Sequence, residues 1–305
     1  RKACSARDYG ETESGTIVCC SQYLRVNGRS SMISIVADAG SNHNGDIRKA
    51  YKLTEEAARA GCTVIKWQLF EASRLYHKDH PNYAGTKALE LPLDWLDELK
   101  LCASSCGIEF MVTPFYPQAV DVIDPLVKRH KIASGDINFF PLLQAVGNTG
   151  KPVLLSTAHA TRREIAKTLD ALINNGAPRY DITLMHCQGY YPASPEQANL
   201  KRIQWLQNDY GWEKVGLSSH VKEWWCDLPA ITYGITVIEK HLALTEDDPE
   251  APHSLLPDEM AQFVKAVRDC EKALQDVDDS NPEFLSLARR NPSNWLRPFD
   301  DTIVK

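Results

Sequence analysis

The sequence predicts an α/β fold, a TIM (β/α)8 barrel over residues 32–275, with an irregular N-terminal extension at 1–31 and a short linker-like C-terminal tail at 276–305. Short β-branched runs alternate eight times with longer segments of helical period, which is typical of a parallel sheet with helical crossovers. Eight such units in about 245 residues match the size of one barrel. The rival is an open doubly wound sheet, but no GxGxxG follows the first strand.

Each expected strand is a short apolar or β-branched run. These runs are Ile33–Ala37, Thr63–Gln68, Glu109–Thr113, Arg129–Ile132, Pro152–Leu155, Ile182–His186, Val215–Ser218 and Val237–His241. The helices expected between and after them are Ile47–Ala60, Leu93–Ser105, Pro117–Val122, Pro141–Val146, Thr161–Asn174, Asn199–Asn208, Trp225–Tyr233 and Pro257–Leu274. Three of these helices carry start signals: Asp46, Thr161 followed by Glu164, and Pro257.

Composition excludes several classes of protein. The net charge is −6, and 34 Lys and Arg are interleaved with 40 Asp and Glu without a basic block, so no nucleic-acid partner is expected. No apolar run reaches the roughly 18 residues that a membrane span needs, and no signal-peptide pattern opens the chain. We therefore expect a cytoplasmic protein that acts on small molecules.

Every expected strand ends in polar residues. In a TIM barrel the loops after the strands converge over one mouth, and the active site lies there. The strand-end residues include, in chain order, Asp38, Asn42, Lys66, Gln68, Thr113, Lys131, Ser134, Asp136, Ser156, His186, Tyr191, Ser218, His220, Glu239 and His241. These side chains are therefore expected around one site.

Two lysines lie inside apolar strands, Lys66 after Val64-Ile65 and Lys131 before Ile132. A buried charge is costly unless it is paired. With the hydroxyls of the neighbouring strand ends, the two lysines form a donor set suited to a phosphate and a carboxylate. The alternative is that one or both ammonium groups extend to solvent.

Two histidines end the last two strands. His220 and His241 would lie a few ångströms apart at the mouth, and two imidazoles with nearby carboxylates suit a borderline divalent ion such as manganese, cobalt or zinc. The alternative is that each is a hydrogen-bonded core residue. His186 is expected either as a third ligand or as a packed residue below the site.

Eight segments at these strand ends resemble motifs of the sialic acid synthase family, the phosphoenolpyruvate-dependent synthases of nine-carbon sugar acids. They are Ala37-Asp38-Ala39-Gly40-Ser41-Asn42-His43-Asn44-Gly45 (A-E-I-G-x-N-H-x-G), Val64-Ile65-Lys66-Trp67-Gln68 (V-K-F-Q), Phe110-Met111-Val112-Thr113-Pro114-Phe115 (F-x-S-T-P-F), Lys131-Ile132-Ala133-Ser134-Gly135-Asp136 (K-I-x-S-G-E), Leu155-Ser156-Thr157-Ala158-His159 (L-S-T-G-M), Met185-His186-Cys187 with Tyr191-Pro192 (L-H-C…Y-P), Gly216-Leu217-Ser218-Ser219-His220 (G-Y-S-D-H) and Ile238-Glu239-Lys240-His241 (E-K-H).

The resemblance implies a TIM-barrel synthase that condenses phosphoenolpyruvate with an aldehyde sugar like N-acetylmannosamine and releases phosphate. By position, it implies that His220 and His241 bind a divalent metal, manganese first and otherwise magnesium, cobalt or zinc. It implies phosphoenolpyruvate contacts from Lys66, Thr113, Lys131, Ser134, Ser156 and Ser218. Further substrate contacts would come from Asn42, Gln68, His186, Tyr191 and Glu250, and the catalytic groups would be Asp38, Asp136, Glu239 and Lys131.

The chain departs from the family pattern in a cluster of positions. The departures are Asp38 and Asp136 for Glu, Glu250 for the Asp of a P-D-H segment at Pro249-Glu250-Ala251, Ala158-His159 for G-M, Ser219 for Asp, and Gly189 for Asn. The family's C-terminal antifreeze-like domain is not expected after Asp300–Lys305. We therefore expect the barrel domain only, which leaves a barrel-to-barrel homodimer open.

Two other functions stay open. In one, Lys131 is the Schiff-base nucleophile of a metal-free aldolase. In the other, the altered acids belong to a barrel that binds phosphorylated ligands or sugars without turnover.

Overall fold

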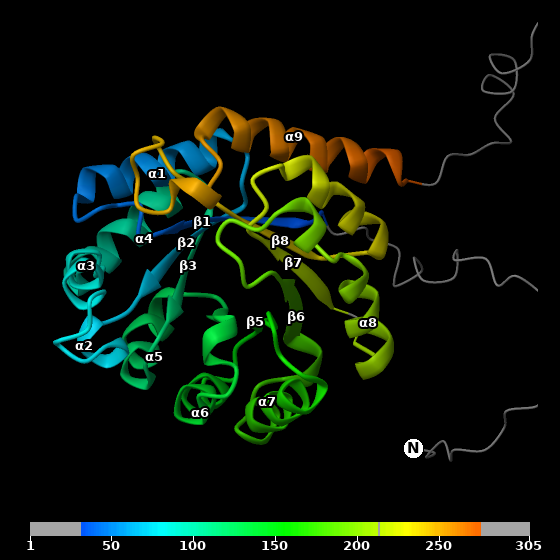
Figure 1. The fold of residues 1–305 in the computed structure, drawn as a ribbon, viewed down its shortest axis with the longest axis horizontal. Helices are drawn as coiled ribbons and strands as arrows, with labels where there is room; N and C mark the ends of the chain where they lie inside the picture. Colours follow the sequence, from blue (N-terminus) through cyan, green and yellow to red (C-terminus); the bar gives the residue numbers. More distant parts are fainter. Residues whose placement is uncertain (1–31, 213, 276–305) are drawn as a thin grey trace, which may run out of the picture. The chain divides into compact units, whose positions relative to one another are not determined.

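The computed structural model describes residues 32–212 and 214–275, in which eight parallel strands form a barrel with helices around it (Figure 1). The hydrogen-bonded order is β3-β2-β1-β8-β7-β6-β5-β4. The end strands β3 and β4 contact each other, so the ring closes there without a ladder among the described residues. The predicted TIM barrel is confirmed, whereas the expected extension at 1–31 and tail at 276–305 lie outside the described residues.

All eight predicted strands are present, with ends shifted by up to three residues. They are β1 (Ser34–Gly40), β2 (Val64–Leu69), β3 (Glu109–Pro114), β4 (His130–Ile132), β5 (Val153–Ser156), β6 (Ile182–Cys187), β7 (Val215–Ser219) and β8 (Val237–His241). The predicted helix starts also hold. Asp46 accepts a hydrogen bond from Arg48 N, and Thr161 forms a capping box with Glu164.

The helices differ from the prediction in three places. The α-helices are α1 (Ile47–Arg59), α2 (Ala72–Leu75), α3 (Tyr83–Ala88), α4 (Leu96–Ser105), α5 (Pro117–Ile123), α6 (Phe140–Asn148), α7 (Arg162–Asn174), α8 (Lys201–Tyr210) and α9 (Pro257–Ala273). The short helices α2 and α3 were not predicted. The predicted helix at Trp225–Tyr233 is instead the 3-10 segment η7 (Trp224–Tyr233), because Pro229 inside it has no N–H to donate. The predicted helix from Leu93 likewise begins as a 3-10 turn, η2 (Leu93–Trp95).

Further 3-10 turns lie in the connections. They are η3 (Asp124–Leu126), η4 (Ser134–Asp136), η5 (Arg179–Asp181), η6 (Pro195–Gln197) and η8 (Ala251–His253). Two of them, η4 and η8, follow strands β4 and β8 at the carboxyl ends of the barrel. They therefore carry side chains toward the mouth.

An apolar layer fills the middle of the barrel. One residue from each of six strands packs in a single cluster: Val36, Val64, Met111, Leu154, Met185 and Val237. Successive side chains of a strand point to opposite faces. The residues two positions further along each strand therefore also face the interior, directly above this layer.

Side chains bridge the seam between β3 and β4 at the floor of the barrel. Arg129, just before β4, donates to both carboxylate oxygens of Glu109 at the start of β3, at 2.9 and 3.3 Å. It also donates to Ser34 Oγ on β1 at 2.9 Å. An ion pair thus joins the two strands that no ladder joins.

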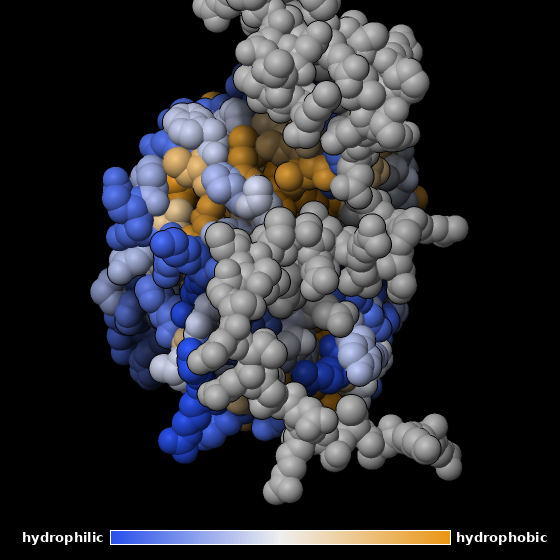
Figure 2. Space-filling view, turned by 90° about the vertical axis from the view of Figure 1, so that its right-hand side faces the viewer, coloured by the Kyte–Doolittle hydropathy of each residue, from blue (hydrophilic) through white to orange (hydrophobic). Residues whose placement is uncertain are grey.

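The outer surface mixes hydrophilic and hydrophobic areas. Figure 2 shows one such face, in which hydrophobic residues gather in the upper half and hydrophilic residues lie along the lower and left margins. Among the described residues, no helix has the length and apolar character to cross a bilayer.

Candidate active site

A layer of buried polar residues lies directly above the apolar layer. Its members each lie two residues beyond an interior-facing position of a strand and come from all eight strands: Asp38, Lys66, Thr113, Lys131, Ser156, Cys187, Ser218 and Glu239. None is more than 6% exposed. Seven of them were predicted from the sequence, and the exception is Cys187.

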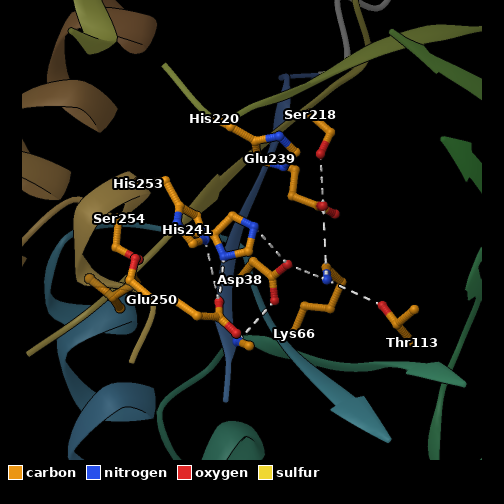
Figure 3. A network of polar contacts seen from close by, with 12 residues as sticks. Asp38, Lys66, Thr113, Ser218, His220, Glu239, His241, Glu250, His253 and Ser254 are labelled. Atoms are coloured by element: carbon orange, nitrogen blue, oxygen red, sulfur yellow. Dashed lines mark hydrogen bonds and ion pairs between the residues drawn. The ribbon is translucent and has the colours of Figure 1, made fainter. Parts of the chain in front are cut away.

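Lys66 joins strands β1, β2 and β3. Its Nζ lies 2.5 Å from Asp38 Oδ2 and donates to Thr113 Oγ1 at 3.2 Å (Figure 3). Gly40 N donates to the other oxygen of Asp38 at 3.0 Å. The lysine and the carboxylate therefore hold each other in place at the centre of the barrel.

A second ion pair lies next to the first in the same layer. Lys131 Nζ donates to Glu239 Oε1 at 3.0 Å, and Ser218 Oγ donates to the same oxygen at 3.0 Å. Lys66 Nζ is 3.8 Å from that oxygen, so the two pairs form one network. Because Lys66 and Lys131 are 2% and 4% exposed, the alternative in which they extend to solvent is wrong.

The network favours the charged forms of Asp38, Glu239 and Lys66. Burial disfavours charge on each of them, but the attraction between neighbours prevails. It lowers the pKa of Asp38 and Glu239 and raises the pKa of Lys66. Two cations and two carboxylates therefore share a space from which water is largely excluded.

Several polar atoms near this layer have no partner among the described residues. Ser156 Oγ and Glu239 Oε2 are buried without a hydrogen bond, and so is Asp136 Oδ2 on η4. Burial raises the pKa of Asp136 to about 6. Unsatisfied buried donors and acceptors are costly, and a ligand in the interior would satisfy them.

His220 and His241 lie side by side, with ring centres 5.3 Å apart. Each has its Nδ1 next to an oxygen: His220 to the Gln188 carbonyl at 2.7 Å and His241 to Glu250 Oε2 at 2.7 Å. With Nδ1–H as the donor in both, each Nε2 is directed away from these acceptors, and His241 Nε2 lies 3.5 Å from Asp38 Oδ2. Carboxylate or carbonyl acceptors behind an imidazole are the usual second layer of a metal site.

Glu250 is held by the first loop of the barrel. Ser41 donates to Glu250 Oε1 through its backbone N at 2.8 Å and its Oγ at 2.7 Å. Asn42 accepts from Glu250 N at 2.8 Å and donates to the Leu242 carbonyl at 2.8 Å. The amide of Asn42, predicted to contact substrate, is therefore bonded to protein on both sides and positions Glu250.

His186 is not brought together with the other predicted residues. Its neighbours Met185 and Cys187 face the interior, so His186 points outward, where its Nε2 is 2.7 Å from the Ala198 carbonyl. Of the two expectations for His186, a third metal ligand or a packed residue, the second describes this position. Strand alternation in Met185-His186-Cys187 was the signal that could have identified Cys187.

The remaining predicted residues surround the mouth. Gln68 is half-buried two residues beyond Lys66, and Ser134 Oγ accepts from Ala158 N at 3.0 Å. The ring of Tyr191 lies 3.9 Å from that of His220. The sequence analysis missed two residues here, Gln188 and His253, and the second has a ring centre 4.6 Å from that of His241.

Two departures from the family pattern have a structural explanation. A Cβ at Gly189 would lie 2.0 Å from His159 Nε2, so His159 fills the space of a side chain at 189. Ser219 Oγ donates to Asp227 at 2.7 Å, and Asp227 is paired with the buried Lys240 at 2.8 Å. Asp227 thus supplies the carboxylate that Ser219 lacks.

Comparison with known proteins agrees with this geometry. The family model described as the NeuB family matches residues 53–279, about three quarters of the chain. The chain belongs to the NeuB family. The predicted resemblance to sialic acid synthases is therefore confirmed, and with it, at the level of the family, the prediction of an enzyme that forms carbon–carbon bonds.

Relatives of this NeuB-family chain have assigned names. It is 38% identical over 278 residues to the N,N'-diacetyllegionaminic acid synthase of Campylobacter jejuni, covering 84% of this chain and 83% of the relative. It is 30% identical to the N-acetylneuraminate-9-phosphate synthase of Mus musculus, covering 79% and 70%. The N-acetylneuraminic acid synthetase of Leptospira borgpetersenii, solved with citrate, superposes with a TM-score of 0.77 at 28% identity, covering 85% and 94%.

Proposed function

We propose that this chain condenses phosphoenolpyruvate with an aldehyde sugar of the N-acetylmannosamine type to a 2-keto-3-deoxy sugar acid and releases inorganic phosphate. The observation that carries the proposal is the buried layer in which Lys66, Lys131 and the Ser156 hydroxyl, which has no partner among the described residues, lie beside two histidines anchored through Nδ1. The names of the relatives support the same class of reaction.

The lysines would bind the anionic donor. Phosphoenolpyruvate carries a phosphate and a carboxylate, and Lys66 and Lys131 both lie near Glu239, with the hydroxyls of Thr113 and Ser218 close by. Fixed donors in a site that excludes water stabilise developing charge without reorganisation. Because both ammonium groups are paired with carboxylates, binding of the anion would shift these ion pairs toward the ligand.

A divalent metal fits His220 and His241. Their Nε2 atoms are imidazole ligands of the kind that manganese, cobalt and zinc accept, with manganese expected first, and Asp38 Oδ2 lies 3.5 Å from His241 Nε2 as a neighbouring carboxylate. When bound, the ion would polarise the aldehyde oxygen of the acceptor. The protein's own contribution is to fix both imidazoles through Gln188 and Glu250.

The reaction requires proton transfer as well as charge stabilisation. C3 of phosphoenolpyruvate attacks the aldehyde carbon, water adds at C2, and the C2–O bond to phosphate breaks. Asp136, whose pKa is raised to about 6, has the proton affinity expected of a general acid or base near neutral pH. Asp38 and Glu239 are ionised through their lysine partners and would orient the water.

A panel of candidate aldehydes identifies the acceptor. Phosphate release from phosphoenolpyruvate is measured with manganese against N-acetylmannosamine, its 6-phosphate, a diacetamido trideoxy sugar aldehyde and short aldehydes. We expect release that depends on both the metal and one acceptor. Loss of release in His241→Ala together with loss of metal binding supports the assignment, and full activity in that variant overturns it.

The same panel separates the two rivals. A Schiff-base lysine must be a free amine, but Lys131 donates to a carboxylate 3.0 Å away; a borohydride-trapped adduct on Lys131 would revive that alternative. Thermal stabilisation by phosphoenolpyruvate with no release for any acceptor would favour the barrel that binds without turnover.

A further inference from the structure

A third histidine lies beside the candidate metal ligands. The ring centre of His253 is 4.6 Å from that of His241 and 6.1 Å from that of His220, and those two rings are 5.3 Å apart. The three imidazoles thus form a triangle. No expected motif contains His253, because the family's P-D-H segment falls on Pro249-Glu250-Ala251.

The size of this triangle matches one ion at its centre. With a metal–nitrogen distance of about 2.1 Å and a ring centre about 1.1 Å beyond the nitrogen, three imidazoles at tetrahedral angles have ring centres about 5 Å apart. The three observed separations, from 4.6 to 6.1 Å, bracket that value.

A second observation places a nitrogen of His253 within ligand distance of His241 and of Glu250. Ligand atoms of His241, Glu250 and His253 all lie within 4.8 Å of one another. His253 Nε2 is 3.9 Å from Glu250 Oε2, the oxygen next to His241 Nδ1. The carboxylate therefore lies between the two imidazoles and can orient both.

The backbone around His253 is well anchored. His253 N donates to the Glu250 carbonyl at 3.2 Å, and Ser254 Oγ donates to the same carbonyl. Asn42 Nδ2 lies 3.4 Å from Ser254 Oγ. These bonds fix the backbone of His253 next to Glu250.

We propose that His253 is a third imidazole ligand of the divalent ion that His220 and His241 bind. The proposal rests on the metal site of the proposed function. Three protein nitrogens with one open position form the usual catalytic zinc arrangement. The site should therefore bind zinc and cobalt more tightly than manganese and magnesium, whichever ion supports turnover.

The test is a cobalt titration of the metal-free protein, followed by visible absorption. Four-coordinate cobalt absorbs far more strongly than six-coordinate cobalt, so the spectrum reports ligand number without turnover. The variants are His253→Ala and His253→Gln, and Gln keeps a polar side chain of similar size. The matched control is His77→Ala, which removes a histidine whose side chain is 89% exposed.

We expect an intense spectrum in the wild type and in His77→Ala. In both His253 variants we expect a weak spectrum and cobalt affinity lower by at least tenfold, the loss that even outer-layer partners of a metal site can cause.

Wild-type spectrum and affinity in both His253 variants overturn the proposal and leave the two-histidine site standing. If only His241→Ala loses cobalt binding, His253 is not a ligand and the proposal is overturned. If the wild type binds no cobalt, the metal site of the proposed function is itself wrong. Circular dichroism of the apo variants identifies a folding failure, in which case the Gln variant decides.

Discussion

Asp136 links the candidate chemistry to a stability effect that depends on pH. Its folded pKa of about 6 lies above the ordinary value of 3.8 because of burial, so the folded state holds the proton more tightly than the unfolded state. The contribution of Asp136 to stability is therefore most favourable below pH 4 and is lost as the pH rises through about 6.

Replacement of Asp136 by Asn removes this dependence. We expect the variant to gain stability relative to the wild type at pH 8 and to lose that advantage as the pH falls to 4. Urea denaturation at both pH values measures it. The control is Asp170→Asn on the exposed side of α7, for which no such difference is expected. An equal difference at both pH values in the Asp136 variant would contradict the prediction.

Lys66 and Asp38 are expected to be energetically coupled. Lys66→Met leaves Asp38 buried without its ammonium partner, and breaking a buried ion pair typically costs about 3–5 kcal/mol. We expect the double variant Lys66→Met/Asp38→Asn to be more stable than Lys66→Met alone. A double-mutant cycle by urea denaturation tests this. Additive effects would mean that the pair contributes no coupling.

The sequence was sufficient to predict which strand-end residues gather at the site, but not which of them pair with each other. Alternation of strands and helices, together with polar strand ends, sufficed to bring Asp38, Lys66, Lys131 and Glu239 to one site. Sequence alone does not reveal which carboxylate faces which lysine, because that depends on the stagger of the strands around the ring. The role of His253 depends on a loop conformation that carries no local sequence signal.

Among the elements, η7 has a structural role that its sequence does not announce. It brings Asp227 to Lys240, and both side chains are fully buried. Lys240 Nζ also donates to Ser219 Oγ and to the Val221 carbonyl, which flank His220. This cluster therefore ties the strand end that carries His220 to the strand end that carries His241.

We expect Asp227→Ala to destabilise the fold by about 3–5 kcal/mol, because it leaves the Lys240 ammonium buried and unpaired. Adding Ser219→Asp should restore much of that stability, because Ser219 is the cross-strand partner of Lys240. Thermal denaturation of the single and double variants checks this. Failure of the second substitution to rescue would mean that Asp227 acts through another contact.

The elements that escaped prediction share a physical cause. Helices α2 and α3 have four and six residues, too few for a helical period to stand out, and α3 contains Gly85. In η7 the apolar pattern is helical, but Pro229 removes one backbone donor. The long helices and the strands were found because their patterns repeat over whole turns or over several alternations.

At the scale of the whole barrel, the seam between β3 and β4 depends on side chains. We expect Arg129→Met, which removes the bonds to Glu109 and Ser34, to cost about 1.5–3 kcal/mol. For a domain of this size each kcal/mol corresponds to a melting temperature lower by about 2–4 °C. Because Arg129 lies at the floor, the Km for phosphoenolpyruvate should not change. Calorimetry and steady-state kinetics measure both, and a raised Km with an unchanged melting point would contradict this account.

The loop after β1 is hydrogen-bonded to the loop after β8, and this has a consequence for the order in which the site is assembled during synthesis. Ser41 and Asn42 bind Glu250 and Leu242, which the ribosome adds roughly 200 residues later. Until β8 emerges, Lys131 lacks Glu239 and the first loop lacks Glu250. A chain that ends before β8 therefore lacks Glu239, His241 and Glu250, and its Lys131 ammonium has no carboxylate partner in the layer. The polar layer is complete only when the last strand has joined the barrel.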